Sequence, residues 1–277
     1  MSPSDTFGSI NREFWNEHAH TLYKEDWVGR INDQVRDCIQ QNADWLNVGQ
    51  QRADTGSPVK LLDYACGFGS GSMALSESVD IMRGIDISES MVNGYNEIAR
   101  NLGLYPNGMA AVQGNLLDEP GDRVIDGHDF FDADAIVMTM ALHHIKYPAA
   151  LLSKMVQRLR PNGVVIIVDW LDPSPTLTLA GTDTEFSTVS GASPSQMSHD
   201  GHHRHSQVGP HQQAHTTIAR AGFSEKDMGL LFKLAGCEDS SFDVRAYKDI
   251  SYIPEHSSGT NGGMERRMFI AKGRKSI

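Results

Sequence analysis

The stretch "LLDYACGFGSG", residues 61–71, decides the fold, because it joins an apolar run directly to the alternating glycines Gly67, Gly69 and Gly71. Glycine adopts positive φ angles and lets a ligand approach the backbone closely. A strand followed by glycines and then by a helix is typical of a nucleotide site at the carboxyl edge of a parallel sheet. The spacing is not that of a phosphate loop, and Ser72 stands where the dinucleotide fingerprint has its third glycine. The stretch therefore does not favour ATP or GTP.

Short apolar runs alternate with amphipathic segments on the C-terminal side of this stretch. Ser88 and Ser224 are expected to cap helices, and Gly103 is expected to end the helix that Ser88 begins. Several strand candidates are apolar on both faces, which is typical of parallel strands covered by helices on each side. The expected strands are 59–65, 81–87, 109–115, 132–142, 163–170, 241–250 and 264–274. The fold class is therefore α/β.

Two regions lie outside this alternation. Residues 8–47 have apolar side chains at helical spacing, so we expect a helical cap segment over residues 1–58, ahead of a main domain at 59–277. Residues 171–215 are rich in Ser, Thr, Gly, Pro and His, which predicts a long flexible insert or lid. Half of the chain's 12 histidines lie in this insert, namely His199, His202, His203, His205, His211 and His215. Because no ordered metal-binding spacing accompanies them, we expect a solvated loop and no metal site.

The overall charge limits the classes of partner. The 277-residue chain has a formal net charge of −11, and this argues against nucleic acid and against an anionic membrane surface. Its three cysteines lie far apart, so neither a disulfide framework nor a thiolate zinc site is indicated. Neither a secretory signal nor an apolar run long enough to span a bilayer is visible. We expect a cytoplasmic protein, with the nucleus as an alternative location.

Polar residues end the second and third expected strands. Asp86 closes "GIDIS", where a carboxylate can accept hydrogen bonds from both ribose hydroxyls of an adenosine. Asn115 follows the third strand in "GNLLD" and can hydrogen-bond the edge of an adenine. The sequence therefore predicts an adenosine lying across the carboxyl edge of the sheet.

Five segments in order carry a family resemblance: "LLDYACGFGSG", "GIDISESMV", "GNLLD", "MALHHI" and "LRPNGVVIIVDW". They resemble the successive motifs of class I S-adenosylmethionine-dependent methyltransferases. The most similar group is the small-molecule one that includes ubiquinone-biosynthesis and fungal secondary-metabolite enzymes. The resemblance implies a Rossmann-like, seven-stranded, mostly parallel sheet whose last strand, 264–274, is antiparallel, with the N-terminal helical segment as a lid. It also implies S-adenosyl-L-methionine as cofactor and methyl transfer to a small molecule at O, N, S or C.

The resemblance also implies roles for individual residues. Asp63, Ala65 and Gly67 would line the methionine end of the cofactor, and Thr139 and Met140 would lie beside its sulfonium. Asp86 would hold the ribose, and Tyr23 would close over the cofactor. The adenine would be flanked by Ile87 and Met91 and touched at its edge by Asn115 and Leu116. The chain departs from the family loop D-x-G-x-G-x-G at Ala65, which adds a methyl group at the first glycine position. We expect the loop to tolerate this methyl group.

Three residues are candidates for catalysis. His143 and His144 follow the fourth strand, where a neutral imidazole could remove a proton from an acceptor. Packing or capping is the competing role for at least one of the two. Asp169 ends the fifth strand and could orient an acceptor or cap the loop that follows. Methyl transfer from a sulfonium needs chiefly alignment and exclusion of water, so the catalytic set can be small.

Two other readings of the function stay open. The acceptor could be a protein side chain, within a regulatory complex, and a protein partner or a homodimer is compatible with the acidic charge. Alternatively, the chain could be a non-catalytic binding subunit with a methyltransferase fold, which Ala65 and the lack of an evident base would favour.

Overall fold

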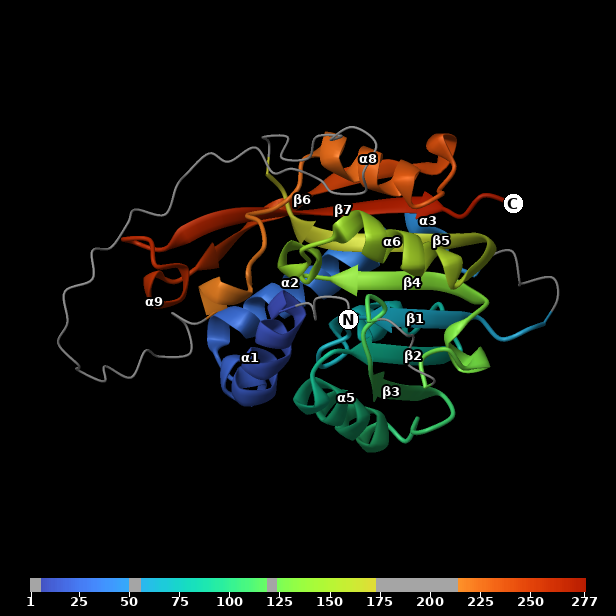
Figure 1. Ribbon diagram of the computed structural model, residues 1–277, viewed down its shortest axis with the longest axis horizontal. Helices are drawn as coiled ribbons and strands as arrows, with labels where there is room; N and C mark the ends of the chain where they lie inside the picture. Colours follow the sequence, from blue (N-terminus) through green and yellow to red (C-terminus); the bar gives the residue numbers. More distant parts are fainter. Residues whose placement is uncertain (1–5, 50–55, 119–123, 173–213) are drawn as a thin grey trace.

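A seven-stranded sheet forms the centre of the computed structural model, which describes residues 6–49, 56–118, 124–172 and 214–277 (Figure 1). The strands are β1 (Lys60–Tyr64), β2 (Ile81–Asp86), β3 (Met109–Gln113), β4 (Ala133–Thr139), β5 (Leu159–Trp170), β6 (Asp243–Ile253) and β7 (Met264–Arg274). Their order is β3-β2-β1-β4-β5-β7-β6; β7 runs antiparallel to both of its neighbours, β5 and β6, and the pairs from β3 to β5 are parallel. The predicted Rossmann-like α/β fold with an antiparallel last strand is therefore confirmed.

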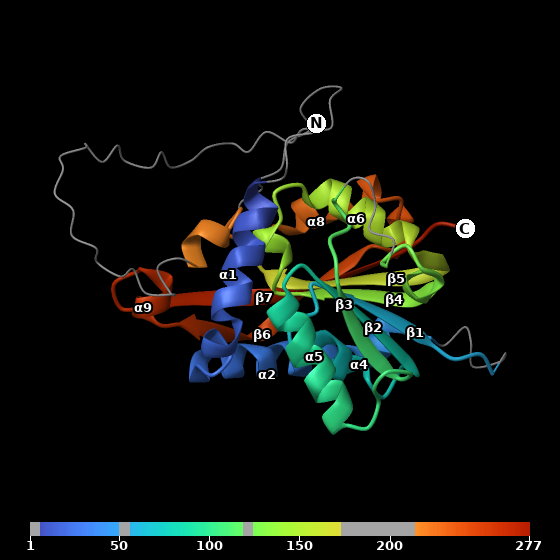
Figure 2. The same cartoon turned by 60° about the horizontal axis from the view of Figure 1, so that its bottom comes forward.

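Helices cover both faces of the sheet (Figure 2). One face carries α2 (Asp26–Gln40), α3 (Ala43–Leu46), α4 (Ser70–Leu75) and α5 (Glu89–Asn101), and the other carries α6 (Pro148–Gln157) and α8 (Glu225–Leu234). Along β4, Ile136 and Met138 pack under α6 and α8, whereas Ala135 and Val137 face the opposite helices. Because both faces are buried, the central strands are mostly apolar, as the sequence predicted, with Asp63 and Asp134 as buried exceptions.

The helix ends follow their capping residues. The Ser88 hydroxyl accepts a hydrogen bond from the backbone N–H of Met91 at the start of α5. Gly103 lies just beyond the end of that helix with a φ of 71°. Ser224 and Asp227 form a reciprocal capping box at the start of α8. These three predictions are confirmed, and each cap satisfies backbone groups that a helix end leaves without an intrahelical partner.

The first helix, α1 (Thr6–Leu22), lies across the carboxyl ends of the strands instead of joining either layer (Figures 1 and 2). Asn16 on α1 accepts hydrogen bonds from the Ser88 hydroxyl at 2.8 Å and from the backbone N–H of Ser90 at 3.3 Å. Asn11 donates to the carbonyl oxygen of Thr217 at 3.4 Å. α1 thus connects the start of α5 to the segment that follows residue 213.

The order of the strands reverses between β1 and β4, because the chain proceeds outward to β2 and β3 and then returns to β4. In open α/β sheets such a reversal leaves a crevice at the carboxyl ends of the two strands. The short helices are η2 (His128–Phe130), η3 (Leu142–His144), η4 (His215–Thr217), η5 (Asp239–Ser241) and α9 (Glu255–Ser258). η3 follows β4 directly and η4 packs against α1, so both lie near this crevice.

Two predictions concern the rest of the chain. No helix in the described ranges is long and apolar enough to cross a membrane. Of the long insert predicted at 171–215, residues 173–213 lie outside the described residues, and with them five of its histidines (His199, His202, His203, His205 and His211). The sixth, His215, begins η4.

Candidate active site

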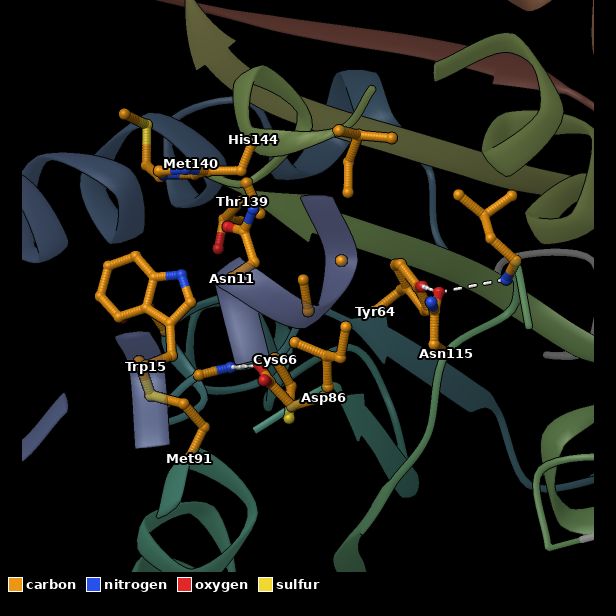
Figure 3. A pocket seen from close by; sticks show the side chains of 18 of the residues that line it. Asn11, Trp15, Tyr64, Cys66, Asp86, Met91, Asn115, Thr139, Met140 and His144 are labelled. Atoms are coloured by element: carbon orange, nitrogen blue, oxygen red, sulfur yellow. Dashed lines mark hydrogen bonds between the residues drawn. The ribbon is translucent and has the colours of Figure 1, made fainter. Parts of the chain in front are cut away.

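The first pocket opens at the crevice between β1 and β4 (Figure 3). Its walls come from the glycine loop after β1, the end of β2, the turn after β3, the end of β4 and α1. The described walls contain one carboxylate, Asp86, and one ammonium group, Lys146. The remaining lining is mostly apolar, aromatic or amide-bearing, which suits a ligand with a planar ring and a polar sugar.

The glycine loop takes the conformation that its sequence requires, in spite of the alanine. Ala65 has a φ of 55°, in the left-handed region that favours glycine, and Gly67 follows with a φ of 50°. A Cβ on Gly67 would lie 2.6 Å from the Tyr23 hydroxyl oxygen, so a side chain there would collide with Tyr23. Gly71 lies where α4 packs closely on the sheet, and a Cβ on Gly71 would lie 2.9 Å from Val137. The Tyr23 hydroxyl therefore lies against the loop backbone at Gly67, and both residues line the pocket.

Asp86 ties the second strand to this loop. Its Oδ2 accepts the backbone N–H of Gly67 at 2.9 Å, and its Oδ1 accepts that of Ser88 at 2.9 Å. Each carboxylate oxygen can accept a further hydrogen bond, so the group can still bind a diol. Burial raises the pKa of Asp86 to about 6, and the backbone hydrogen bonds oppose that rise. Asp86 is therefore ionised at neutral pH and becomes protonated in mild acid.

Asp63 lies beneath the loop and is fully buried. Its Oδ2 accepts hydrogen bonds from the backbone N–H of Ser72 at 2.9 Å and from the Ser72 hydroxyl at 2.8 Å. Oδ1 has no hydrogen-bond partner among the described residues, and burial raises the pKa of Asp63 to about 7. Asp63 thus fixes α4 against β1 and does not line the pocket.

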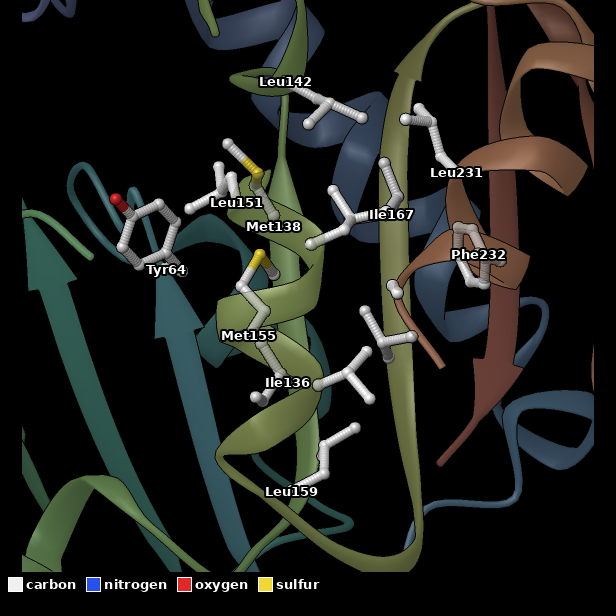
Figure 4. Close-up of a cluster of buried hydrophobic side chains, with 14 of the residues drawn as sticks. Tyr64, Ile136, Met138, Leu142, Leu151, Met155, Leu159, Ile167, Leu231 and Phe232 are labelled. Atoms are coloured by element: carbon white, nitrogen blue, oxygen red, sulfur yellow. The ribbon is translucent and has the colours of Figure 1, made fainter. Parts of the chain in front are cut away.

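The turn after β3 is held by its own hydrogen bonds. Asn115 Oδ1 accepts the Tyr64 hydroxyl at 3.0 Å and the backbone N–H of Leu117 at 3.1 Å, and Asn115 Nδ2 donates to Asp118 at 2.9 Å. The ring of Tyr64 belongs to the apolar cluster under α6 (Figure 4). Asn115 lines the pocket with one amide hydrogen left to donate. Leu116 does not line it, because its backbone N–H points to the Tyr64 hydroxyl, 3.3 Å away.

A second cavity, of about 460 Å³ between the described residues, lies beside the first. Its size falls within the range of small-molecule sites. Five residues line both cavities and thus form their junction: Trp15, Tyr23, Asn32, Met140 and His144. The rest of its wall comes from α2, from residues 214–221 and from the ends of β6 and β7. The two cavities therefore meet at the carboxyl end of β4.

The two histidines differ in their surroundings. His143 is buried, and its Nδ1 lies 2.7 Å from Asp169 Oδ1. Burial opposes ionisation of Asp169, yet the neighbouring His143 and the hydrogen bonds from His143 and Trp170 hold the pKa of that carboxyl below its usual range. Asp169 lines neither cavity, because it is enclosed by these partners.

His144 lies at the junction of the cavities. Its Nδ1 is 2.8 Å from the carbonyl oxygen of Thr217, which can only accept, so Nδ1 carries the hydrogen and Nε2 keeps a lone pair. Desolvation and the neighbouring His143 ring, whose centroid is 4.1 Å away, lower the pKa of His144 to about 3. The imidazole is therefore neutral at physiological pH.

Two residues in the wall of the first pocket have a strained backbone conformation. Met140 directly follows β4 and has a φ of 51°, which is costly for a residue other than glycine. Ala65 and Met140 thus follow the two strands that flank the crevice, and both line the first pocket. Strained backbone of this kind clusters at functional sites.

Most of the site residues predicted from the sequence line the first pocket: Tyr23, Ala65, Gly67, Asp86, Ile87, Met91, Asn115, Thr139, Met140 and His144. His143 lines only the second cavity, and Asp63, Leu116 and Asp169 line neither. Sequence reasoning missed Asn11 and Trp15 of α1 and Asn32 of α2. Amphipathic spacing showed that these segments are helical, but it carried no signal for which face would cover the sheet edge. No group of three potential metal ligands occurs among the described residues.

Comparisons with known proteins agree with this geometry. A family model described as a methyltransferase domain matches residues 30–240. An uncharacterized methyltransferase of Schizosaccharomyces pombe is 33% identical over 139 residues, which are 50% of this chain and 47% of that protein. The chain thus matches about half the length of this relative.

Solved structures show the same fold at low identity. Magnesium protoporphyrin IX methyltransferase from Synechocystis, crystallised with S-adenosylhomocysteine (SAH), is 16% identical with a TM-score of 0.55, and the match covers 98% of this chain and 100% of that one. A Haloferax volcanii protein described as a putative methyltransferase, in complex with the Trm112 activator, is 14% identical with a TM-score of 0.55, and the match covers 96% and 97% of the two chains.

Proposed function

From the premise that the chain belongs to the methyltransferase-domain family, we propose that it transfers a methyl group from S-adenosylmethionine to a small molecule in the second cavity. The observation that carries this proposal is the meeting of two cavities at Met140 and His144. One cavity has the residues for a nucleoside, and the other is large enough for an acceptor.

The first pocket fits the parts of the cofactor. Asp86 offers lone pairs to the ribose hydroxyls, while Ile87 and Met91 supply apolar surface for the adenine ring. Ala65 and Gly67 line the pocket, so the methionine part would lie against this loop beside Tyr23. Thr139 and Met140 then lie at the sulfonium end. When bound, the cofactor supplies a methyl group that is already activated for in-line displacement.

His144 is placed to assist the acceptor. Its free Nε2 lone pair can accept a hydrogen bond from an acceptor O–H or N–H, and it can take the proton as the acceptor forms its bond to the methyl carbon. The pKa near 3 means that His144 is always in the accepting form but holds a proton weakly. We therefore assign it to orienting the acceptor and passing its proton on to solvent. His143 and Asp169 are positioning residues that support the His144 ring from behind.

α1 covers one side of the junction between the cavities. Trp15 packs edge-on against His144, with ring centroids 5.7 Å apart, and Asn11 and Asn16 hold the helix across the edge of the sheet. A dry junction strengthens alignment of the acceptor with the methyl group and protects the sulfonium from hydrolysis.

The alternatives make different predictions. A small-molecule acceptor needs a cavity beside the cofactor site, and the described residues line one of about 460 Å³ there. A non-catalytic subunit would tolerate a distorted glycine loop, yet Ala65 keeps the left-handed conformation that glycine would take. Both observations favour the enzyme that acts on a small molecule.

The test is methyl transfer from labelled S-adenosylmethionine to an extract of the source organism, separated into protein and small-molecule fractions. We expect label in the small-molecule fraction, and its loss with Asp86→Ala. Label in the protein fraction alone would move the acceptor to a protein. No transfer, together with no binding of SAH by calorimetry, would leave a non-catalytic fold.

A further inference from the structure

The walls of the second cavity have a charge opposite to that of the chain. The whole chain has a formal net charge of −11, yet the described lining of this cavity contains two arginines, Arg220 and Arg266, and neither aspartate nor glutamate. The rest of the lining is largely apolar and aromatic. A cavity that gathers guanidinium groups within an acidic protein is complementary to an anionic ligand.

Arg220 is the more informative of the two. Its guanidinium makes no hydrogen bond with any described residue, and both Nε and Nη1 are buried. The guanidinium carbon lies 5.1 Å from the centre of the Phe223 ring, which fixes its plane but satisfies none of its donors. Burial of donors without acceptors is costly, so these groups call for an acceptor, which a water, an ion or a ligand can supply.

The nearest acidic groups do not supply those acceptors. Asp227 and Asp169 are close enough to act on Arg220 electrostatically, while desolvation, the larger effect, lowers the pKa of this guanidinium. Asp169 is committed to His143 and Trp170, and Asp227 belongs to the capping box with Ser224. Neither makes an ion pair with Arg220 among the described residues.

The backbone of Arg220 is attached to the proposed catalytic region. The carbonyl oxygen of His143 accepts the backbone N–H groups of Ala219 at 2.9 Å and Arg220 at 3.2 Å. Thr217, in the same segment, accepts the Nδ1 hydrogen of His144. The segment therefore holds the backbone of Arg220 at a fixed place relative to the junction of the two cavities.

Trp27 and Arg266 place further donors in the wall of this cavity. The indole N–H of Trp27 is buried without a described partner. Arg266 donates to the carbonyl oxygen of Ala221 and lies over the Trp170 ring, so it contributes charge while it is held by the protein. A ligand that satisfies the unpaired donors must therefore offer acceptors, and a planar carboxylate matches the guanidinium fork best.

We propose that the methyl acceptor is an amphipathic carboxylate, with its apolar body against the aromatic wall and its carboxylate on Arg220. This inference rests on the proposed function for the identity of the cavity as the acceptor site. Arg220 is then a substrate-binding residue that distinguishes acids from their neutral or cationic analogues.

The experiment compares 4-phenylbutyrate with its neutral amide on SAH-saturated protein, with tryptophan fluorescence and calorimetry as readouts. Trp15, Trp27 and Trp170 line the cavity, so occupancy should change their emission. We expect the acid to bind about tenfold or more tightly than the amide, because hydrogen bonds to charged groups are worth that much. Arg220→Gln should abolish this preference, and Arg220→Lys should retain part of it.

Arg100→Gln is the matched control, because Arg100 also stacks on an aromatic ring, that of Tyr105, but lies on α5 outside the cavity. It should keep the full preference for the acid. The melting temperature of Arg220→Gln should stay the same or rise, since its guanidinium has no hydrogen bond to lose.

Equal binding of acid and amide to the wild type, no binding of the acid, or a preference that survives Arg220→Gln would overturn the inference. A large fall in melting temperature for Arg220→Gln would do the same, because it would give the residue a structural role. SAH binding is measured separately: if SAH binds and the acid is not preferred, only this inference fails, whereas failure of SAH to bind removes the proposed function itself.

Discussion

The two cavities that meet at His144 are built in different ways. The first takes its walls mostly from residues that directly follow β1, β2, β3 and β4, and neighbouring backbone groups hold those walls in place. The second collects its walls from α1, α2, residues 214–221 and the ends of β6 and β7, which are far apart in the sequence. The first is thus a property of the fold, while the second depends on tertiary contacts between segments that are distant in the sequence.

The two also differ in charge. The first pocket has a carboxylate, Asp86, where a sugar is expected, and the second has guanidinium groups where an acceptor is expected. Substitutions in one cavity should therefore change one ligand and leave the other unaffected. The predictions below test this separation, from the largest expected effect to the smallest.

His144→Ala should lower kcat by about 10²- to 10⁴-fold, the usual contribution of a positioned proton acceptor. The affinity for SAH should stay within a factor of about two, because the nucleoside contacts lie elsewhere in the first pocket. Steady-state kinetics and calorimetry measure the two quantities on the same preparation. An unchanged kcat would make His144 a packing residue, and a large loss of SAH affinity would show that the cavities are not separable.

Asp86→Ala should weaken SAH binding by roughly 1.5–3 kcal/mol, the value of hydrogen bonds to a charged group. Calorimetry measures the change, and Asp44→Ala, an exposed carboxylate on α3, is the matched control that should bind normally. Binding of 4-phenylbutyrate should be unaffected by Asp86→Ala. Wild-type affinity for SAH in this variant would remove the ribose assignment.

The pH dependence of SAH binding follows from the raised pKa of Asp86. The ionised carboxylate binds the diol, so affinity should be constant above pH 7 and should fall as the pH drops through about 6. By pH 5 the loss should be about tenfold, since one pH unit below a pKa leaves about a tenth of the group ionised. Calorimetry from pH 5 to pH 8 measures this, and a profile that stays flat in the wild type would contradict an ionised Asp86 in the site.

Ala65→Gly should raise the free energy of unfolding by about 1 kcal/mol or less. Glycine relieves the cost of the left-handed conformation, and the greater entropy of the unfolded chain offsets part of this gain. Ala149→Gly, inside α6, is the control and should lose about 0.5–1 kcal/mol. Urea unfolding measures both; destabilisation by Ala65→Gly would show that the methyl group contributes packing.

The sequence predicted the fold and most of the first pocket because their signals are local. Gly67 and Asp86 each follow an apolar strand, and parallel strands bring their carboxyl ends to one edge, so linear order gives spatial position. The family prediction from the ordered motifs is confirmed by the matching family model. The capping residues Ser88 and Ser224 were predictable for the same reason.

The rest depends on tertiary contacts that sequence spacing does not encode. Trp15 and Asn11 reach the site only because α1 is held across the sheet edge by hydrogen bonds to distant segments. Arg220 gained its place through the carbonyl oxygen of His143, far away in the chain. Leu116, although adjacent to Asn115, is turned inward by Tyr64. A motif therefore fixes the backbone at the site more firmly than it fixes which side chains face the ligand.

A crystal structure of the protein saturated with SAH would locate the nucleoside itself. We expect ribose hydroxyls within hydrogen-bonding distance of the Asp86 carboxylate, and a sulfur atom that faces the second cavity between Met140 and His144. A crystal grown in saturating SAH that shows the crevice filled by Tyr23 and Trp15, or the nucleoside bound elsewhere, would contradict this expectation.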